Sequence, residues 1–252
     1  MSQTLRIPEI LEMARREGKV SVDGLAAHFG VTLQTIRRDL SDLAEAGRLE
    51  RVHGGAILPS GITNIAYEER RALNQAAKMR IGQAAANLIP NDSAIFLNIG
   101  TTTEAVAHAL LHHQNLLVVT NNINVAQILS RNPDCQVIVA GGVIRAADGG
   151  LVGELAVRSI HAFKFDLAVI GCSALDKDGD LLDFDLQEVV VSQAALGQSR
   201  RSILVCDHSK LARTAPARIT SLSEIDQMVT DQALPNALAQ SCLVSQTKIN
   251  VA

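Results

Sequence analysis

A chain of 252 residues, of which 47% are hydrophobic and 2% aromatic, can form two domains with an aliphatic core, and it offers few rings on which RNA bases could stack. Its net charge of −3 excludes a uniformly basic nucleic-acid binder, so attraction for DNA would have to come from cations placed on one local surface. The four cysteines form no C-x-x-C pair, which favours buried free thiols over disulfides or a zinc site. We expect a cytoplasmic protein without a membrane partner, because the sequence shows neither a signal-peptide pattern nor an apolar run of membrane-spanning length.

A first helix is predicted near the start of the chain, because apolar residues recur there at helical spacing. The stripe consists of Ile7, Ile10, Leu11 and Ala14. We expect Pro8 in the first turn, where a missing N–H is tolerated, and Gly18 at the end of the helix. This helix would support the elements that follow.

Residues 21–46 have the pattern of two short helices joined by a tight turn. Ser21 and Thr32 are N-cap residue types, and Gly30 can adopt the positive φ that a sharp turn needs. The buried face of the second helix is predicted at Leu33, Ile36, Leu40 and Leu43. Its opposite face is polar and carries Gln34, Thr35, Arg37, Arg38 and Ser41. Because such side chains reach base edges and phosphates in a major groove, the stretch predicts a helix-turn-helix, with an ordinary helical hairpin as the alternative.

The segment RLERVHGGAIL predicts a small β-hairpin after the second helix, which Gly47 would end. A basic hairpin in this position is a wing that can contact DNA; the alternative is a purely structural hairpin. Within the first domain, residues 1–58, the residues expected to contact DNA are Ser21, Thr32, Gln34, Thr35, Arg37, Arg38, Arg51, His53, Gly54 and Gly55. Pro59-Ser60-Gly61 then marks a linker over residues 59–66.

Residues 67–252 form the second predicted domain. It is expected to begin with one helix over residues 67–88. Strand-like runs then alternate with helical segments: AIFL, LLVV, QVIVA, LAVI, SILVC and QMVT, with KINV as an edge strand. Runs of β-branched residues with intervening helices predict an α/β domain with a parallel sheet covered on both faces.

Polar or glycine-rich loops follow three of these strands. Asn98–Thr103 follows the first strand and opens a helix, Thr120–Asn122 follows the second, and Gly141-Gly142 follows the third. Because ligands of open α/β sheets bind at the carboxyl ends of the strands, we expect the loops to converge on an anion of phosphate size. Helix capping would explain each loop taken alone.

Further ligand-binding groups are expected later in the chain. Arg145 and the glycines of DGGLVGE would either close over a ligand or only turn the chain. Asp183 could bind a ligand hydroxyl. Lys210 could bind a phosphate, with an ordinary surface lysine as the alternative. The full set of predicted ligand residues is Asn98, Gly100, Thr101, Thr102, Thr103, Asn121, Asn122, Gly141, Gly142, Arg145, Gly150, Gly153, Asp183 and Lys210.

IRRDL followed by HGGA in a winged helix-turn-helix resembles the DeoR family of bacterial transcriptional repressors. NIGTTTEAVAHAL, VTNNINVA, VAGGVIRAADGGLVGE and CDHSK extend this resemblance over the whole chain. It implies a second domain similar in fold to ribose-5-phosphate isomerase, which binds a phosphorylated sugar or polyol, with glycerol 3-phosphate as the expected effector. By the same resemblance, the family's ligand-site motifs are matched by Gly100, Thr101, Thr102, Asn121, Gly141, Gly142 and Lys210. The family often has Asp where this chain has Asn98, which changes what that side chain offers a ligand hydroxyl.

We therefore expect a two-domain repressor that binds operator double-stranded DNA as a homodimer or homotetramer and responds to a phosphorylated metabolite. No cofactor, metal or catalytic residue is expected. Three other functions stay open: a repressor that answers to a different phosphosugar, an isomerase, and a metal sensor. The isomerase would use Asp183, Asp185 or Asp207 as its general base, and the metal would sit on one helix between Glu104, His108 and His112.

Overall fold

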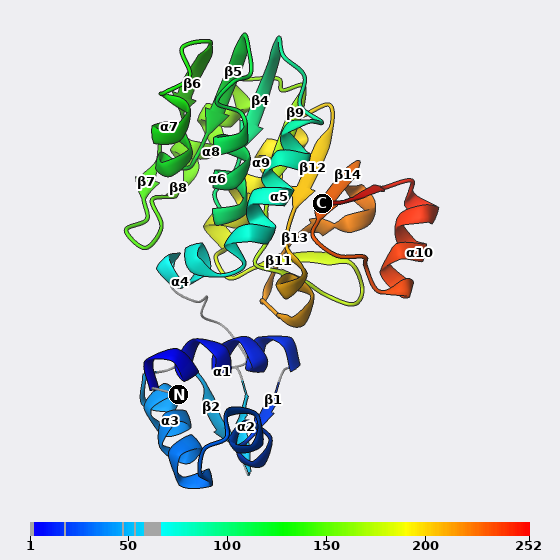
Figure 1. The fold of residues 1–252 in the computed structure, drawn as a ribbon. Coiled ribbons are helices and arrows are strands. Elements are labelled where there is room, and N and C mark those ends of the chain that lie inside the picture. The colour runs from blue at the N-terminus through cyan, green and yellow to red at the C-terminus, as the bar shows by residue number, and fades with distance from the viewer. Residues whose placement is uncertain (1–2, 18, 47, 53, 58–66) are drawn as a thin grey trace.

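The computed structural model describes residues 3–17, 19–46, 48–52, 54–57 and 67–252 (Figure 1). The expectations for Gly18, Gly47, His53 and the linker over residues 59–66 lie outside these residues. None of the helices in the described ranges is long and apolar enough to cross a membrane.

The N-terminal domain is a winged helix-turn-helix, as the sequence predicts. Its elements are α1 (Gln3–Glu17), β1 (Lys19–Ser21), α2 (Val22–Phe29), α3 (Leu33–Glu45), β2 (Glu50–Val52) and β3 (Gly55–Ile57). The strands form an antiparallel sheet in the order β1-β3-β2, so the hairpin gains a third strand, β1, that the sequence pattern did not indicate. The helices and this sheet enclose a small aliphatic core that includes Ile10, Leu25, Ile36 and Leu40.

The ends of the two central helices follow the predicted capping pattern. The hydroxyl of Ser21 accepts a hydrogen bond from the N–H of Gly24 at 3.0 Å, and that of Thr32 accepts one from the N–H of Thr35 at 3.2 Å. Gly30 ends α2 with a φ of 61°. These bonds satisfy N–H groups that have no partner inside the helix, which fixes where α2 and α3 begin.

Two expectations about the helices of this domain are wrong. Pro8 lies inside α1 rather than in its first turn, because the helix already begins at Gln3. Leu33 is 41% exposed rather than buried, because it is the first residue of α3 and the contact with the core starts one turn later, at Ile36.

The second domain is an α/β fold, in agreement with the prediction. Its elements up to the middle of the sheet are α4 (Tyr67–Ala72), α5 (Gln75–Ala86), β4 (Ser93–Leu97), α6 (Thr101–Ala109), β5 (Leu116–Thr120), α7 (Ile123–Leu129), β6 (Cys135–Val139), β7 (Val143–Ile144), β8 (Leu151–Val152), α8 (Glu154–His161) and β9 (Leu167–Ile170). There follow β10 (Ala174–Leu175), β11 (Asp180–Asp183), α9 (Leu186–Gly197), β12 (Ser202–Val205), η1 (His208–Ala212), β13 (Ala217–Ser221), η2 (Leu222–Glu224), β14 (Gln227–Thr230), α10 (Asn236–Ser245) and β15 (Lys248–Val251).

The single helix expected over residues 67–88 is two helices. Asn74 lies between α4 and α5 with a left-handed φ of 51°, which stops the first helix. The side chain of Asn74 donates a hydrogen bond of 2.8 Å to Asp207, far away in the sequence. Helical periodicity continues across the break and therefore did not reveal it, because the bond that holds Asn74 is tertiary.

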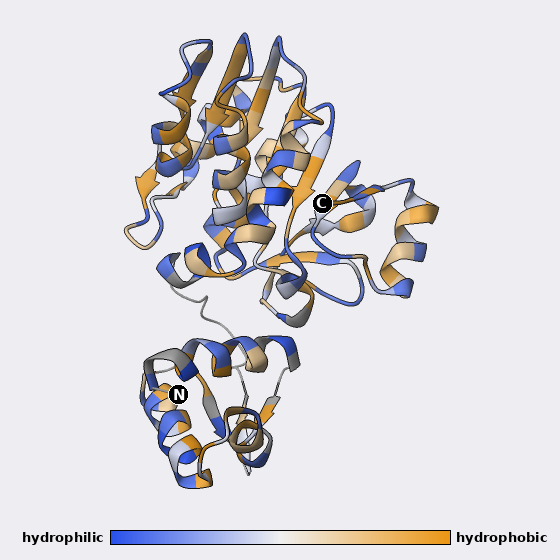
Figure 2. Ribbon diagram, in the orientation of Figure 1, coloured by the Kyte–Doolittle hydropathy of each residue, from blue (hydrophilic) through white to orange (hydrophobic). Residues whose placement is uncertain are grey.

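The central sheet has the order β15-β14-β12-β9-β4-β5-β6, and its strands are parallel, including β15 at one edge as expected. Helices α5, α6 and α7 cover the face turned to the viewer in Figure 1, and α8 and α9 cover the other. Figure 2 shows the strands as the most hydrophobic part of this domain, as expected for strands buried on both faces. A second core packs the small antiparallel sheet β10-β11-β13 and α10 against the β12–β14 side.

The strand order reverses between β4 and β9, because β5 and β6 extend the sheet on one side of β4 and the later strands extend it on the other. Open α/β sheets bind ligands at the carboxyl ends of the strands beside such a reversal. Here those ends carry the loops Asn98–Gly100 and Gly171–Cys172.

Candidate functional sites

The predicted DNA-contacting face of α3 lies on the surface. Gln34, Arg37 and Arg38 are exposed and Thr35 is half-buried, while Ile36 and Leu40 on the opposite side are fully buried. The hydroxyls of Thr32 and Thr35 are 2.9 Å apart and belong to the cap of the helix. The N-terminal half of α3 therefore presents exposed hydrogen-bond donors on a helix whose orientation the core fixes, as the predicted DNA contact requires.

The wing is tied directly to this helix. Arg51 on β2 donates a hydrogen bond of 3.2 Å to the backbone oxygen of Arg37, while its side chain stays exposed. Gly54 forms the turn with a φ of 75°. Gly55, expected at the turn as a DNA contact, is instead buried in β3, where an added Cβ would lie 2.0 Å from the backbone oxygen of Val20. Gly55 thus serves the close approach of β3 and β1.

In the second domain, cationic side chains from separate segments converge on the start of α6. Lys78 of α5 donates a hydrogen bond to the backbone oxygen of Arg70 in α4, and the hydroxyl of Thr101 approaches the same oxygen at 3.5 Å. Lys210 on η1 and Arg213 just after it are close enough to act electrostatically on Lys78. We call Arg70, Lys78, Lys210 and Arg213 the cation cluster.

One carboxylate, Asp207, offsets part of this charge. Asp207 accepts hydrogen bonds from Asn74 and from the N–H of Ser209. Burial disfavours its ionised form, but Lys210, these two hydrogen bonds and Lys78 outweigh that effect and lower the pKa of the Asp207 carboxyl to about 2. Asp207 is therefore ionised throughout the physiological range and offsets one of the positive charges of the cluster.

The two lysines feel this excess of positive charge. Burial, together with Lys210, Arg213 and Arg70, lowers the pKa of Lys78 to about 8 against the opposing effect of Asp207. Burial and Arg213 likewise lower the pKa of Lys210. A bound anion would reverse these shifts, because an opposite charge at short range favours the protonated amine.

The start of α6 adds an anion-binding element to the cluster. Gly100 precedes the helix with a φ of 142°, and in the described residues no side chain caps the first N–H groups. These N–H groups and the helix dipole favour a negative charge at this end. Thr101 and Lys78 also line a cavity of about 670 Å³ between α4, α5, α6 and α7, to which Tyr67, Glu104 and Asn124 contribute.

Glu104 lies at the centre of a buried polar network in this cavity. It accepts hydrogen bonds from the hydroxyl of Tyr67 at 2.9 Å and from the side chain of Asn124 at 3.1 Å. Burial and the negative charge of Glu104 raise the pKa of Tyr67 to about 12, so the phenol remains protonated and remains a donor. The described residues hold no group of three or more side chains placed to bind a metal ion, and Glu104 itself is engaged in this network.

Several predicted ligand residues already have internal partners. The side chain of Asn98 donates to Ser192 at 2.7 Å and accepts from the N–H of Ile99 at 2.8 Å, and Asp183 accepts from the N–H of Phe184. Thr103 donates to the backbone oxygen of Gly100. The polar atoms named here are therefore engaged within the domain rather than free for a ligand.

Arg145 is also engaged. It contacts Asp148, Asp185 and Glu188 at 2.6–2.9 Å, so it joins the β7–β8 hairpin to the start of α9. Arg70 reaches the same Asp148 at 2.9 Å and thereby links the cation cluster to the hairpin. Asp148 is held ionised between the two, because both guanidinium groups lower the pKa of its carboxyl against the effect of burial.

The remaining predicted ligand residues are asparagines that form hydrogen bonds, glycines at close approaches or before a helix, and the buried Thr102. Asn122 caps α7, and Asn121 donates to the backbone oxygen of Leu151 while its buried Oδ1 has no hydrogen-bond partner among the described residues. That oxygen is an acceptor available to a ligand hydroxyl. Gly141 and Gly142 pack against α8 and β8, and Gly150 packs beside Ile99. Thr102 is buried in the first turn of α6, and Gly153 precedes α8 with a φ of 93°.

Sequence analysis missed Arg70, Asn74, Lys78 and Arg213. Lys78 carried a recognisable signal, because it shares the buried face of α5 with Ile81, Gly82 and Ala85. A lysine on the apolar face of a helix is rarely buried without a specific reason. Arg70 and Asn74 showed no local pattern, since their hydrogen-bond partners Asp148 and Asp207 are distant in the sequence.

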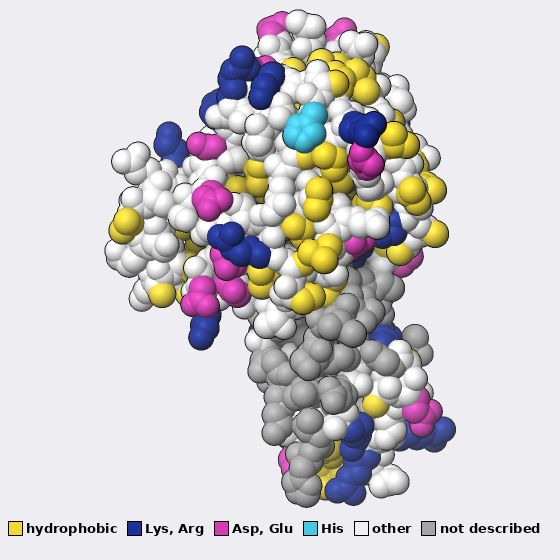
Figure 3. Space-filling model, turned by 180° about the vertical axis from the view of Figure 1, so that it is seen from behind, with side chains coloured by type: hydrophobic (Ala, Val, Ile, Leu, Met, Phe, Trp, Pro, Cys, Tyr) yellow, Lys and Arg dark blue, Asp and Glu magenta, His cyan; other side chains and the backbone are white. Residues whose placement is uncertain are grey.

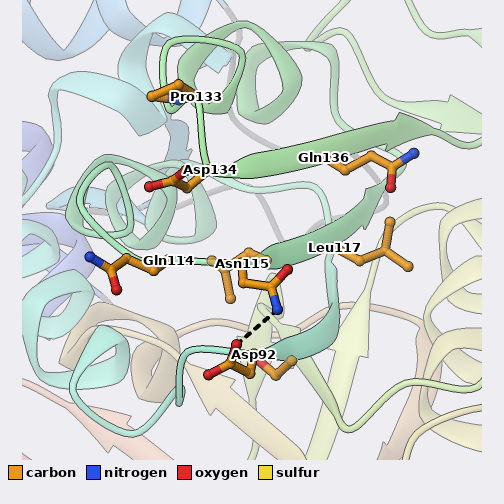
Figure 4. Close-up of a pocket in the computed structure, with 9 residues that line it drawn as sticks. Asp92, Gln114, Asn115, Leu117, Pro133, Asp134 and Gln136 are labelled. Atoms are coloured by element: carbon orange, nitrogen blue, oxygen red, sulfur yellow. Dashed lines mark hydrogen bonds between the residues drawn. The ribbon is translucent and has the colours of Figure 1, made fainter.

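A second cavity of about 670 Å³ lies at the opposite, amino-terminal ends of β4, β5 and β6 (Figure 4). Asp92 and Asp134 point into it from two different loops, and Asn115 donates a hydrogen bond of 2.8 Å to Asp92. Its lining contains two carboxylates and no Lys or Arg. This cavity would repel a phosphate, so the cation cluster is the candidate anion site.

Fold and sites together define a protein with a winged helix-turn-helix and an α/β domain in which cationic side chains gather near the start of one helix. The chain belongs to the DeoR family: residues 6–61 match the DeoR-like helix-turn-helix domain and residues 73–232 match the DeoR C-terminal sensor domain. It is 45% identical to the glycerol-3-phosphate regulon repressor of Escherichia coli, over 95% of both chains. It is 42% identical to the protein of that name from Haemophilus influenzae, over 99% of this chain and 97% of the relative.

Among solved structures, ribose 5-phosphate isomerase A from Methanocaldococcus jannaschii is similar over 55% of each chain, with 12% identity and a TM-score of 0.41.

Proposed function

We propose that this protein is a transcriptional repressor that releases its operator DNA when a phosphorylated polyol, glycerol 3-phosphate, binds the second domain. The observation that carries the proposal is the cation cluster: Lys78 binds the backbone oxygen of Arg70 that Thr101, the first residue of α6, also approaches, and Lys210 is close enough to act on Lys78. The names of the relatives at 42% and 45% identity support the choice of ligand. Repression and induction would then correspond to two arrangements of one protein that differ in affinity for the ligand.

In the proposed complex, the phosphate lies between the first N–H groups of α6, the hydroxyl of Thr101 and the two lysines. The carbonyl oxygen of Asn121 takes a hydroxyl of the glycerol. A phosphate dianion would offset most of the excess charge of the cluster, which is why its affinity should far exceed that of glycerol. Calorimetric titration with glycerol 3-phosphate, glycerol and inorganic phosphate tests this directly, and equal affinity for glycerol and its phosphate would exclude the site.

An isomerase is less well supported by the same geometry. A general base works best when its pKa is near the working pH. The pKa of Asp207 is about 2, and Asp183 and Asp185 accept hydrogen bonds from backbone N–H groups, Asp185 as the N-cap of α9. Incubation with ribose 5-phosphate should therefore yield no ketose, and the appearance of ribulose 5-phosphate would favour the enzyme instead.

Arg37 and Arg38 are expected to divide two kinds of DNA contact between them. Both are exposed on α3, one residue apart, so they point to different parts of the groove. Replacing the base-reading arginine with alanine should cost about 1–3 kcal/mol and relax sequence preference at one position. Replacing the phosphate-reading arginine should weaken binding to all sequences alike. It should also reduce the slope of log affinity against log salt concentration by about one. Operator titrations of both variants over a salt series make the measurement, and unchanged affinity in both would refute the groove assignment.

Effector affinity is expected to fall as the pH rises through the pKa of Lys78. That pKa is about 8 without ligand, and a bound anion raises it, so the complex holds more protons than the free protein above this pH. Between about pH 7 and pH 9 the loss approaches tenfold, while the phosphate stays a dianion because its second pKa is about 6. Titration calorimetry over this range measures the effect.

Lys78→Arg is the matched control for this pH dependence, because a guanidinium stays charged throughout. It should remove the contribution of Lys78 and leave the parallel contribution of Lys210. Burial and the charge of Asp183 raise the pKa of Glu188 to about 7, against the effect of Arg145. Glu188 titrates in both proteins, so its contribution to the pH dependence cancels in the comparison. An affinity that is flat from about pH 7 to pH 9 in the unaltered protein would show that Lys78 does not face the phosphate.

A further inference from the structure

Apolar side chains gather on the back of the α/β domain, the face shown in Figure 3. Six exposed apolar residues come from β6, the β7–β8 hairpin and the first turns of α8 and α9, and each is between 45% and 70% exposed. We call this set the hairpin face: Val139, Val143, Ile144, Leu155, Leu186 and Val190. A contiguous exposed patch of this kind marks an interaction surface rather than ordinary scattered hydrophobic residues.

Contacts between the four elements show that the face is continuous. Leu155 lies beside Gly141, two residues after Val139, because a Cβ on that glycine would be 3.8 Å from the Cβ of Leu155. Val143 and Ile144 pair with β8, which leads directly into α8. Arg145, the next residue, contacts Asp185 and Glu188 and so brings the start of α9, the helix that carries Leu186 and Val190, beside the hairpin.

The size and charge of the hairpin face fit a second copy of this chain. Its side chains expose on the order of 600 Å², close to the roughly 800 Å² that each partner contributes to a stable interface. The adjoining strand β6 is an edge of the sheet, and its residues CQVIV include neither a charge nor a proline that would protect such an edge. The exposed ions on α8 nearest to Leu155, Glu154 and Arg158, pair with each other, so two identical faces can meet without net repulsion.

We propose that the hairpin face is the two-fold interface at which two copies of this chain dimerise. A two-fold axis makes such an interface self-complementary, so the same patch serves both partners. The proposal rests on the proposed function in one respect, because paired recognition helices are what an operator with two half-sites requires.

The interface shares its hairpin with the effector site. Val143 and Ile144 are exposed on β7, while Asp148, in the loop of the same hairpin, holds Arg70 of the cation cluster at 2.9 Å. An anion that binds between Lys78, Lys210 and Thr101 competes with Asp148 for Arg70. Release of Arg70 would loosen the link between the cluster and the hairpin and change the geometry of the dimer, and with it the spacing of the recognition helices.

The test is the oligomeric state of single variants of the full chain. Leu155→Glu on α8 and Leu186→Lys on α9 alter the face from two separate helices, and both positions are exposed, so the fold should tolerate them. Leu243→Glu on α10 is the control, because Leu243 is 72% exposed but lies outside the face. Molar mass is measured by light scattering and sedimentation over a range of protein concentrations, with thermal unfolding as a check on the fold.

We expect each face variant to weaken self-association about tenfold or more and to halve the molar mass at intermediate concentration, while Leu243→Glu matches the unaltered protein. Should a charged variant unfold, Val143→Ala is expected to weaken association by a smaller, measurable factor. An unaltered protein that stays a single chain, or face variants that associate normally, would overturn the proposal. Face variants that become single chains and still bind glycerol 3-phosphate confirm both proposals. If the face variants dissociate as expected but the unaltered protein binds neither operator nor effector, the interface proposal holds and the proposed function is refuted.

Discussion

Replacing Asp39 with alanine is expected to cost the N-terminal domain about 3–5 kcal/mol and to abolish operator binding, because it leaves Arg6 in the core without its carboxylate. Arg6 on α1 and Asp39 on α3 form a bidentate ion pair with distances of 2.9 and 3.3 Å, and their side chains are only 7% and 2% exposed. Breaking one half of a buried pair is far more costly than losing a surface pair. A domain of about sixty residues has few kcal/mol to lose, so most of the variant would be unfolded there.

Asp42→Ala is the matched control, since it removes a carboxylate from the same helix one turn later. Asp42 is exposed and accepts a single hydrogen bond of 2.7 Å from Gln3, so its loss should change stability by less than about 1 kcal/mol. Electrostatics alone would make both variants bind DNA more tightly, because each removes a negative charge near the contact face. Loss of binding in Asp39→Ala only, with effector binding intact, therefore identifies unfolding of the N-terminal domain. Equal unfolding curves for the two variants would contradict the assignment.

The parts of the fold that sequence analysis predicted are those determined by neighbours in the chain. Ser21, Gly30 and Thr32 set the ends of α2 and α3 through bonds that span three or four residues. The parallel strands were recognisable because burial on both faces leaves continuous apolar runs. Resemblance to a family then supplied the loops after the strands as a candidate site.

The parts that sequence analysis could not predict depend on long-range contacts. Nothing near Asn98 shows that Ser192 occupies its amide, and nothing near Asn74 shows that Asp207 stops the helix there. Gly55 was expected at the turn because turns favour glycine, whereas its place is set by the backbone of β1. In the candidate site, the start of α6 was predicted. Most of the cation cluster was not, because its members come from α4, α5 and the segment around η1.

The network around Arg70 gives the proposed switch a physical route. Arg70 lies on α4, the first described element after the N-terminal domain, and it contacts both the cluster and Asp148 of the hairpin. An effector that binds the cluster can change DNA affinity only if it binds one arrangement of these groups more tightly than the other. Coupling of this kind is reciprocal, so operator DNA must weaken effector binding by the same factor by which effector weakens operator binding.

Replacing Lys210 with methionine is expected to produce a repressor that no longer responds to its effector. The loss of one charged hydrogen-bonding partner should weaken glycerol 3-phosphate binding by about 2 kcal/mol, or roughly 30-fold, while operator affinity without effector stays unchanged. The unaltered protein should show a reciprocal coupling of about 5–150-fold in calorimetric titrations with and without operator. Lys177→Met is the control, because Lys177 is exposed in the turn between β10 and β11 and lies away from the cluster. Equal effector affinity in the presence and absence of operator would rule out induction by this ligand. A Lys210→Met variant that is still released from its operator at the original effector concentration would place the phosphate elsewhere.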